Sequence, residues 1–256
     1  MNYPSKLIFL IFFVPLFSVA QNYKPGLVVN LNGDTLHGFI NYGEWENNPK
    51  SISFKHEPTG TPLKFTVNDL KYFSISVGHL AEYQRYTGPI TTNSIEINRL
   101  PEGRDTSFVL DTVFLKVLQK GGKLLLFSYS DTFKIRYFIS ENPSDQPKEL
   151  IYRIYYKNIE GNNQNRTAYE SSYKGQLYDA AAKAGVNSVA LKNDIQKADY
   201  RESDLLSIAA KINGGSEKDP AKNNASKPKT FKILIVIAAS AILAIFLIHD
   251  LVTVHN

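Results

Sequence analysis

"TSFVLDTVFLKVLQKGGKLLLFSYSDTFKIRYFIS", residues 106–140, is the segment most informative about the fold. It contains three apolar runs, separated by turn residues at Lys120-Gly121-Gly122 and near Asp131. Runs of this length that are rich in Val, Phe, Ile and Tyr and joined by short turns are typical of strands in an antiparallel meander. In the last run, the residues expected to share one face are Phe133, Ile135, Tyr137 and Ile139.

Upstream, "GLVVNLNGDTLHGFINY", residues 26–42, alternates in polarity on both sides of Asn32-Gly33. Asn-Gly supplies the positive φ of a tight turn, so a β-hairpin is predicted here. Further strands are expected at "SISF", near residues 63–67 and at "ELIYRIYY", and a polar loop is expected at "EGNNQNR". Adjacent strands with short turns predict an antiparallel β-sheet or a partly closed β-barrel, which would hide its edges.

Three short helices are expected after that polar loop. They are "SSYKGQLYDAAAKAG", ending at Gly185; "SVALKNDIQKA", capped by Ser188; and "ESDLLSIAAKINGG", ending before Gly214. Helices this short must bury their apolar stripes against the sheet or each other. The predicted fold class is therefore α+β, with an antiparallel β domain over residues 21–157 and a helical appendage over residues 158–213.

The amino-terminal end has the organisation of a signal peptide. Lys6 precedes an apolar run over residues 7–17, and small residues follow at Ser18 and Ala20. Signal peptidase requires small side chains at these positions, so residues 1–20 are predicted to be removed by a cut after Ala20. An uncleaved anchor helix is the alternative.

The carboxy-terminal end has the composition of a transmembrane helix. Residues 233–248 contain no charge, proline or glycine. A helix over residues 231–252 matches the hydrocarbon core of a bilayer, which is about 30 Å thick. The polar stretch "GGSEKDPAKNNASKPKT", residues 214–230, is the expected tether, and residues 253–256 form a short cytoplasmic tail.

An export signal followed by one membrane span predicts an inner-membrane, single-pass protein with its main domain in the periplasm. The lysine distribution conflicts with this topology, because the tail has none while the domain side carries Lys218, Lys222, Lys227, Lys229 and Lys232. Long domains are translocated largely regardless of charge, so the export signal is given precedence. A tail-anchored protein with a cytoplasmic domain would fit the lysines but leave residues 1–20 unexplained.

Composition limits the chemistry. The chain has 256 residues, of which 43% are hydrophobic and 21% charged, enough for one domain with a small appendage. The absence of cysteine excludes disulfides, thiolate metal sites and cysteine nucleophiles. The net charge of +5 is modest and scattered, so no nucleic-acid partner is expected. The sequence has no G-x-S-x-G elbow, no phosphate-binding glycine loop and no H-E-x-x-H, so no catalytic or cofactor motif is found. The histidines of the middle, His37, His56 and His79, are too scattered for a metal site.

The stretch "GLVVNLNGDTLHGFINYGEWENNPKSISFK" resembles an uncharacterised family of exported envelope proteins from Bacteroidetes-type bacteria. The motif of that family corresponds here to Gly33, Asp34, Thr35, Trp45, Asn48 and Pro49. The resemblance continues in "VFLKVLQKGGKLLLF", "SYKGQLYDA" and "ADYRESDLLSIAAKIN", and covers most of residues 23–213. It implies a periplasmic module. Many relatives continue into what looks like an outer-membrane β-barrel, whereas the apolar segment here does not alternate in polarity, which favours the inner membrane.

A few positions are candidate sites. Thr35 and Thr112 each follow an Asp and precede an apolar residue, as in the O-glycosylation sites of such bacteria; hairpin chemistry and strand packing are the alternatives. Trp45, the only tryptophan, is either a core plug or a platform for sugar binding. Ser240 and Ala244 form a pair of small residues that would support weak self-association of the membrane helix.

The predicted function is that of a non-enzymatic envelope protein that binds or assembles with an unknown envelope protein or glycan. The alternative is a carboxylate-based envelope hydrolase or glycan-processing enzyme. It would use carboxylates that the sheet brings together, such as Glu102, Asp105 and Asp111.

Overall fold

The computed structural model describes residues 22–159 and 162–215. Its main element is a ten-stranded sheet. The strands of this sheet are β1 (Tyr23–Asn30), β2 (Thr35–Asn41), β3 (Ser51–Lys55), β4 (Leu63–Thr66), β5 (Leu70–Ser76), β6 (Leu80–Thr91), β7 (Phe108–Gln119), β8 (Leu125–Ser130), β9 (Ile135–Ser140) and β10 (Lys148–Glu149). A short 3₁₀ helix, η1 (Ile97–Arg99), lies between β6 and β7.

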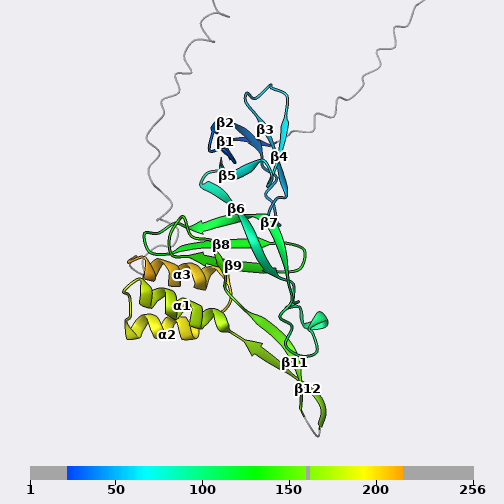
Figure 1. The fold of residues 1–256 in the computed structure, drawn as a ribbon, viewed down its shortest axis with the longest axis vertical. Coiled ribbons are helices and arrows are strands. Elements are labelled where there is room, and N and C mark those ends of the chain that lie inside the picture. Colours follow the sequence, from blue (N-terminus) through cyan, green and yellow to red (C-terminus); the bar gives the residue numbers. More distant parts are fainter. Residues whose placement is uncertain (1–21, 160–161, 216–256) are drawn as a thin grey trace, which may run out of the picture. The chain divides into compact units, whose positions relative to one another are not determined.

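All neighbouring strands of this sheet are antiparallel, in the order β10-β9-β8-β7-β6-β5-β1-β2-β3-β4 (Figure 1). The meander β7-β8-β9 and the hairpin β1-β2 confirm the predicted antiparallel sheet. Strands β10 and β4 form its two edges, so the sheet is open rather than closed.

The β1-β2 hairpin turns at the predicted position, with a three-residue loop. Asn30 and Asp34 close this loop, because the Asn30 N–H donates to the Asp34 carbonyl oxygen at 3.0 Å. Gly33 has φ +101°, a value that residues with a side chain rarely adopt. The left-handed glycine at the end of a three-residue loop matches the second commonest class of hairpin connection.

The sheet curls strongly between β6 and β9. Three strand spacings separate these strands, which corresponds to roughly 14 Å in a flat sheet. The rings of Tyr86 on β6 and Phe138 on β9 nevertheless lie 5.1 Å apart, centroid to centroid. The space enclosed by this curl is filled by buried side chains from β6 to β9: Tyr86, Ile90, Val113, Leu115, Leu125, Phe127, Tyr129 and Phe138.

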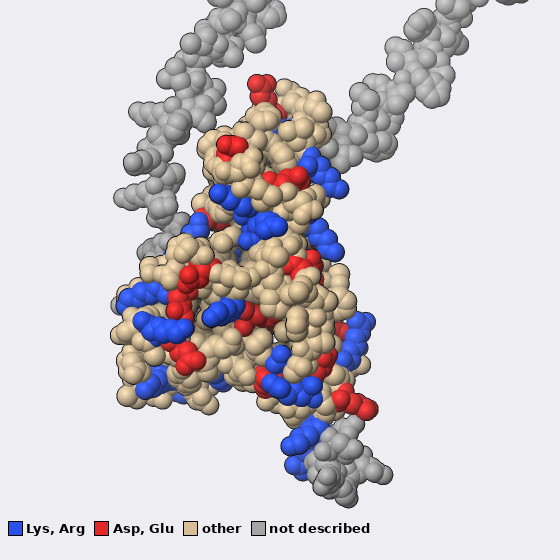
Figure 2. Space-filling model, in the orientation of Figure 1, with Lys and Arg blue, Asp and Glu red and all other residues tan. Residues whose placement is uncertain are grey.

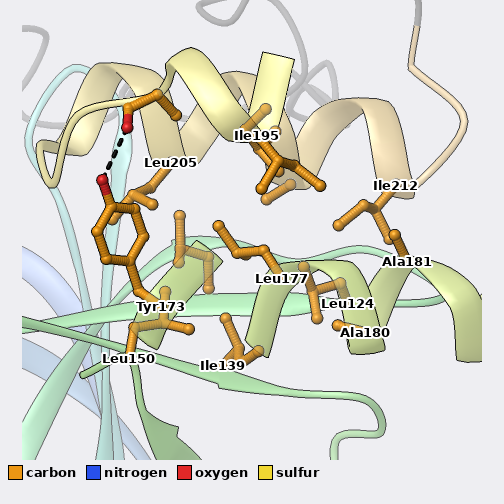
Figure 3. Close-up of a cluster of buried hydrophobic side chains, with 14 of the residues drawn as sticks. Leu124, Ile139, Leu150, Tyr173, Leu177, Ala180, Ala181, Ile195, Leu205 and Ile212 are labelled. Atoms are coloured by element: carbon orange, nitrogen blue, oxygen red, sulfur yellow. Dashed lines mark hydrogen bonds between the residues drawn. The ribbon is translucent and has the colours of Figure 1, made fainter. Parts of the chain in front are cut away.

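Three helices cover the other face of β8 and β9: α1 (Ser172–Lys183), α2 (Val189–Lys197) and α3 (Glu202–Ile212). Figure 3 shows Leu124 and Ile139 pointing toward Leu177 of α1 and toward the side chains of α2 and α3. The Tyr173 hydroxyl donates to the Ala198 carbonyl oxygen at 2.7 Å, which joins α1 to the end of α2. The predicted helices are confirmed, including the cap at Ser188.

The end of α3 is tied back to the loop before β8. The Asn213 side chain accepts hydrogen bonds from the Lys123 N–H at 3.0 Å and the Leu124 N–H at 2.9 Å, and donates to the Leu124 carbonyl oxygen at 2.9 Å. Because Asn213 directly follows α3, these bonds fix the last helix against the sheet.

A second, two-stranded sheet corrects the predicted loop "EGNNQNR". Here β11 (Arg153–Ile159) pairs with β12 (Asn162–Glu170) as an antiparallel hairpin. The prediction of a loop was wrong because a strand in a two-stranded ribbon has no core face to impose apolar alternation. The single strand predicted at "ELIYRIYY" is also interrupted, since β10 ends at Glu149 and β11 begins at Arg153.

All the residues that the structure describes belong to one compact unit. The predicted signal peptide, transmembrane helix and cytoplasmic tail, and most of the tether, lie outside the described residues. In the parts of the chain that are described, no helix combines the length and the apolar character needed to cross a membrane.

Candidate functional site

A pocket of about 670 Å³ lies between the β6-β7 ribbon and the segment 146–153. Sites that hold small ligands commonly fall between about 300 and 1,000 Å³. We call it the Phe108 pocket, and it is lined by Tyr86, Pro89, Thr91, Thr106, Phe108, Leu110, Gln146, Pro147, Lys148, Glu149, Ile151 and Arg153.

One wall of the Phe108 pocket is apolar and exposed. Phe108 and Leu110 are two residues apart on β7, so their side chains point to the same side of the ribbon. They are 58% and 77% exposed. Pro89 and Ile151 add further apolar surface. Neighbouring large apolar side chains that remain in water often mark a place where something binds.

The floor of the pocket includes an edge of β6 that is covered by side chains. Gln146 Nε2 donates to the Thr87 carbonyl oxygen at 2.5 Å, and Arg136 Nε donates to the Thr91 carbonyl oxygen at 2.7 Å. The Thr91 N–H and hydroxyl both donate to the Glu149 carboxylate, at 3.0 and 2.5 Å. Pro89 has no N–H to donate. Residues 146–149 are therefore held firmly against β6.

Buried cations lie beside the pocket, and one of them, Arg153, lines it. Arg136 is 1% exposed, and its Nη1 lies 3.0 Å from Asp131 Oδ2. Arg153 is 8% exposed, and its Nη1 donates to Glu170 Oε1 at 3.0 Å. Each buried guanidinium thus has a carboxylate partner, as burial of a charge requires.

Glu170 joins this cluster to the protein surface. Arg104 donates to both of its carboxylate oxygens, at 2.7 and 2.8 Å, and Ser172 donates to Oε1 at 3.0 Å. These contacts, with that of Arg153, lower the pKa of Glu170 to about 2, the hydrogen bonds from Arg104 being the largest cause. Glu170 is therefore an anion at any physiological pH.

Lys134 is the exception among the buried cations. It is 8% exposed, and its Nζ donates to Asn93 Oδ1 at 2.8 Å. No carboxylate forms a salt bridge with Lys134 in the described part of the chain. Burial lowers its pKa to about 8; Glu149 opposes this change, while Arg136 and Arg153 add to it.

Two buried nitrogen atoms of the cluster have no hydrogen-bond partner among the residues described. They are Arg153 Nε and Asn93 Nδ2, and Asn93 is only 1% exposed. Both atoms are donors. Unpaired buried polar groups are costly, so they require an explanation wherever they cluster.

The structure places the predicted carboxylates in three different surroundings. The pKa of Asp105 is lowered by hydrogen bonds from the Ser107 side chain, the largest cause, and from the Ser107 N–H. Asp111 lines a second pocket, of about 520 Å³, together with Asp131. Glu102 forms an isolated β-bridge with Tyr156.

Asp131 does not have the character of a general acid. Burial acts to raise its pKa, but hydrogen bonds from the Lys134 and Phe133 N–H groups and from Arg136 lower it overall. A glycoside hydrolase needs a carboxylic acid whose pKa is raised, so Asp131 does not favour the hydrolase alternative.

The motif positions occupy separate places. Gly33, Asp34 and Thr35 lie in and beside the exposed β1-β2 loop, whereas Trp45 and Asn48 lie between β2 and β3. Pro49 follows Asn48 and is half-buried. Trp45 is also half-buried, and its ring packs edge-on against the rings of Tyr42, Phe73 and Tyr83.

Asn48 bridges β7 and β8 where their pairing ends. Its Nδ2 donates to the carbonyl oxygens of Phe114, at 2.7 Å, and Ser128, at 3.2 Å. Its Oδ1 accepts the Ser130 N–H at 3.0 Å. The Asn of the motif thus has a clear structural role.

The other sequence candidates are not brought together. Thr35 is exposed, whereas the Thr112 hydroxyl lies 3.0 Å from that of Thr87, and O-glycosylation of Thr35 and Thr112 stays a prediction. His37 and His56 line one pocket and His79 another. Over residues 22–159 and 162–215, no three His, Cys, Asp or Glu side chains are grouped as a metal site would require.

Sequence reasoning missed the Phe108 pocket and its cations. Ile135 shares a face of β9 with Tyr137, as predicted, yet it is 48% exposed because the helices do not cover that end of the strand. Phe133 was predicted on the same face but lies in the turn before β9, where it is 63% exposed. Lys134 and Arg136, on the opposite face, are buried by the curl. The signal in the sequence was that these two cations alternate with apolar residues at the start of β9.

Acidic and basic side chains are interleaved on the face shown in Figure 2. Comparisons of the chain with protein-family models, with curated proteins and with solved structures find no match. The resemblance to exported envelope proteins therefore stays a prediction.

Proposed function

We propose that this protein is a membrane-tethered binding module of the cell envelope and that the Phe108 pocket is its ligand site. The apolar segment 231–252 would hold it in the inner membrane, and the export signal would place residues 21–213 in the periplasm. The ligand is a small molecule, because the pocket volume of about 670 Å³ corresponds to that size class.

The exposed wall of the pocket carries this proposal. Phe108 and Leu110 keep large apolar surfaces in water directly opposite a segment that hydrogen bonds hold in place. A preorganised site loses little conformational freedom when a ligand binds. This combination favours binding over a purely structural role for the ribbon.

Ligand binding is tested with the full chain in lipid nanodiscs and the water-soluble probe 4-phenylbutanol. Saturation-transfer NMR should detect binding to the wild type, and Leu110→Gln should weaken it at least about fivefold, since each 1.4 kcal/mol of lost contact is tenfold. Val109→Gln is the matched control, because Val109 lies on the same strand, is 48% exposed and lines the other pocket. Absence of binding, or equal loss in both variants, would refute the pocket as the site.

Location is tested separately by adding protease to spheroplasts. A periplasmic domain is digested, and the mature protein starts at Gln21. A domain that is protected in intact spheroplasts but digested after lysis would contradict the proposed topology.

A further inference from the structure

The buried polar cluster beside the Phe108 pocket has more hydrogen-bond donors than acceptors. Arg153 Nε and Asn93 Nδ2 are buried without a partner among the described residues. Lys134 Nζ carries three N–H groups and has one protein acceptor, Asn93 Oδ1. Arg153 lines the pocket directly, and it is more than nine-tenths buried.

The carboxylates around these donors already have partners. Glu149 accepts both hydrogen bonds of Thr91, and Glu170 is shared by Arg104, Arg153 and Ser172. Among the residues that the structure describes, no carboxylate forms a salt bridge with Lys134. The group that would complete the cluster is therefore one that accepts hydrogen bonds and carries negative charge.

A carboxylate meets both requirements. It has two oxygens that accept hydrogen bonds and no donor, and its bonds to cationic groups are about twice as strong as bonds between neutral groups. A hydroxyl would bring a donor as well as an acceptor. An ammonium group would bring only donors and a further positive charge to a place that already holds Lys134, Arg136 and Arg153.

We propose that the Phe108 pocket binds a small molecule with an apolar body and a carboxylate, the body lying against Phe108 and Leu110 and the carboxylate lying at Arg153, the buried cation that lines the pocket. This inference rests on the proposed binding function and specifies the ligand class. Lys134 strengthens binding through its charge, since Arg153 and Lys134 are close enough to interact electrostatically.

Three probes that share one apolar body test the proposal: 4-phenylbutyrate, 4-phenylbutanol and 4-phenylbutylamine. Dissociation constants are measured by NMR titration on the full chain in nanodiscs at pH 7. We expect 4-phenylbutyrate to bind at least about tenfold more tightly than 4-phenylbutanol and 4-phenylbutylamine to bind most weakly. Leu110→Gln should weaken all three probes, whereas Val109→Gln should weaken none.

A second variant separates the charge from the fold. Lys134→Met should reduce the preference for 4-phenylbutyrate over 4-phenylbutanol severalfold. Equal affinity for the acid and the alcohol, with Leu110→Gln weakening both, would overturn the carboxylate inference but leave the proposed binding function standing. Failure of all three probes to bind would overturn both.

Discussion

Lys134 should make the stability of this protein rise with pH between 7 and about 9.5. Its pKa is lowered from 10.5 to about 8, with burial as the main cause. Between these two values the unfolded chain binds a proton that the folded chain has released. The free energy of unfolding therefore increases with pH in this window, and the full cost of the buried charge is present below about pH 8.

The size of the effect follows from the two pKa values. Each pH unit between them corresponds to 1.36 kcal/mol, so the buried ammonium costs about 3 kcal/mol at pH 7. About 2 kcal/mol of this cost is recovered by pH 9.5, where the folded protein carries Lys134 largely uncharged.

Lys134→Met isolates this effect because methionine is similar in length and uncharged. The variant loses the hydrogen bond to Asn93, worth about 1 kcal/mol, but it no longer has a buried ammonium, which destabilises the wild type at pH 7. It should be about 2 kcal/mol more stable than the wild type at pH 7 and nearly equal to it at pH 9.5. Buried tyrosines such as Tyr86, whose pKa burial raises to about 12, affect both proteins equally and cancel.

The assay is urea unfolding of the full chain in a non-ionic detergent at pH 7, 8, 9 and 9.5. Fluorescence of Trp45, the only tryptophan, and far-UV circular dichroism report the transition. If the free energy of unfolding changes with pH in the same way for the wild type and the variant, Lys134 is not a buried charge. A variant less stable than the wild type at pH 7 would refute the same reasoning.

Three further substitutions test the fold, each measured by the same unfolding assay. Asn48→Ala removes the three hydrogen bonds by which the Asn48 side chain joins β7 to β8, and it should lower the free energy of unfolding by about 2 to 3 kcal/mol. A loss under about 0.5 kcal/mol would contradict the bridging role of Asn48. Gly38→Ala places a Cβ 2.2 Å from the Lys55 carbonyl oxygen, so a loss of about 1 to 3 kcal/mol is expected, and an unchanged midpoint would be inconsistent with this packing. Ser188→Ala removes the cap of α2, whose hydroxyl accepts the Leu191 N–H at 3.1 Å, and should cost about 1 kcal/mol, whereas Ser188→Asp should retain most of the stability.

The features that the sequence predicted correctly depend on local signals. Asn32-Gly33 determines a turn through its own backbone preference, and Ser188 caps α2 through a bond to a residue three positions away. Gly185 ends α1 with φ +71°. Such signals act within one turn of chain, so a single sequence suffices to find them.

The parts that escaped prediction depend on contacts between distant segments. Asn48 bonds to residues 66 and 80 positions away, and β1 pairs with β5 across the β2-β4 segment. The Phe108 pocket combines residues 86–91, 106–110 and 146–153. Lys134 and Arg136 beside it are buried where the sheet curls, which apolar periodicity does not report. Strand β12 was missed because a two-stranded ribbon imposes no apolar alternation on its strands.

The contact of α3 with β8 and β9 affects how the chain folds during its synthesis. Leu124 and Ile212 belong to one core, yet they enter the growing chain 88 residues apart, counted from 124 to 212. Until α3 has emerged, the apolar face of β8 and β9 stays uncovered, and exposed faces of this kind promote aggregation of incomplete chains. A truncation that removes the last helix should therefore yield an insoluble product rather than a smaller domain.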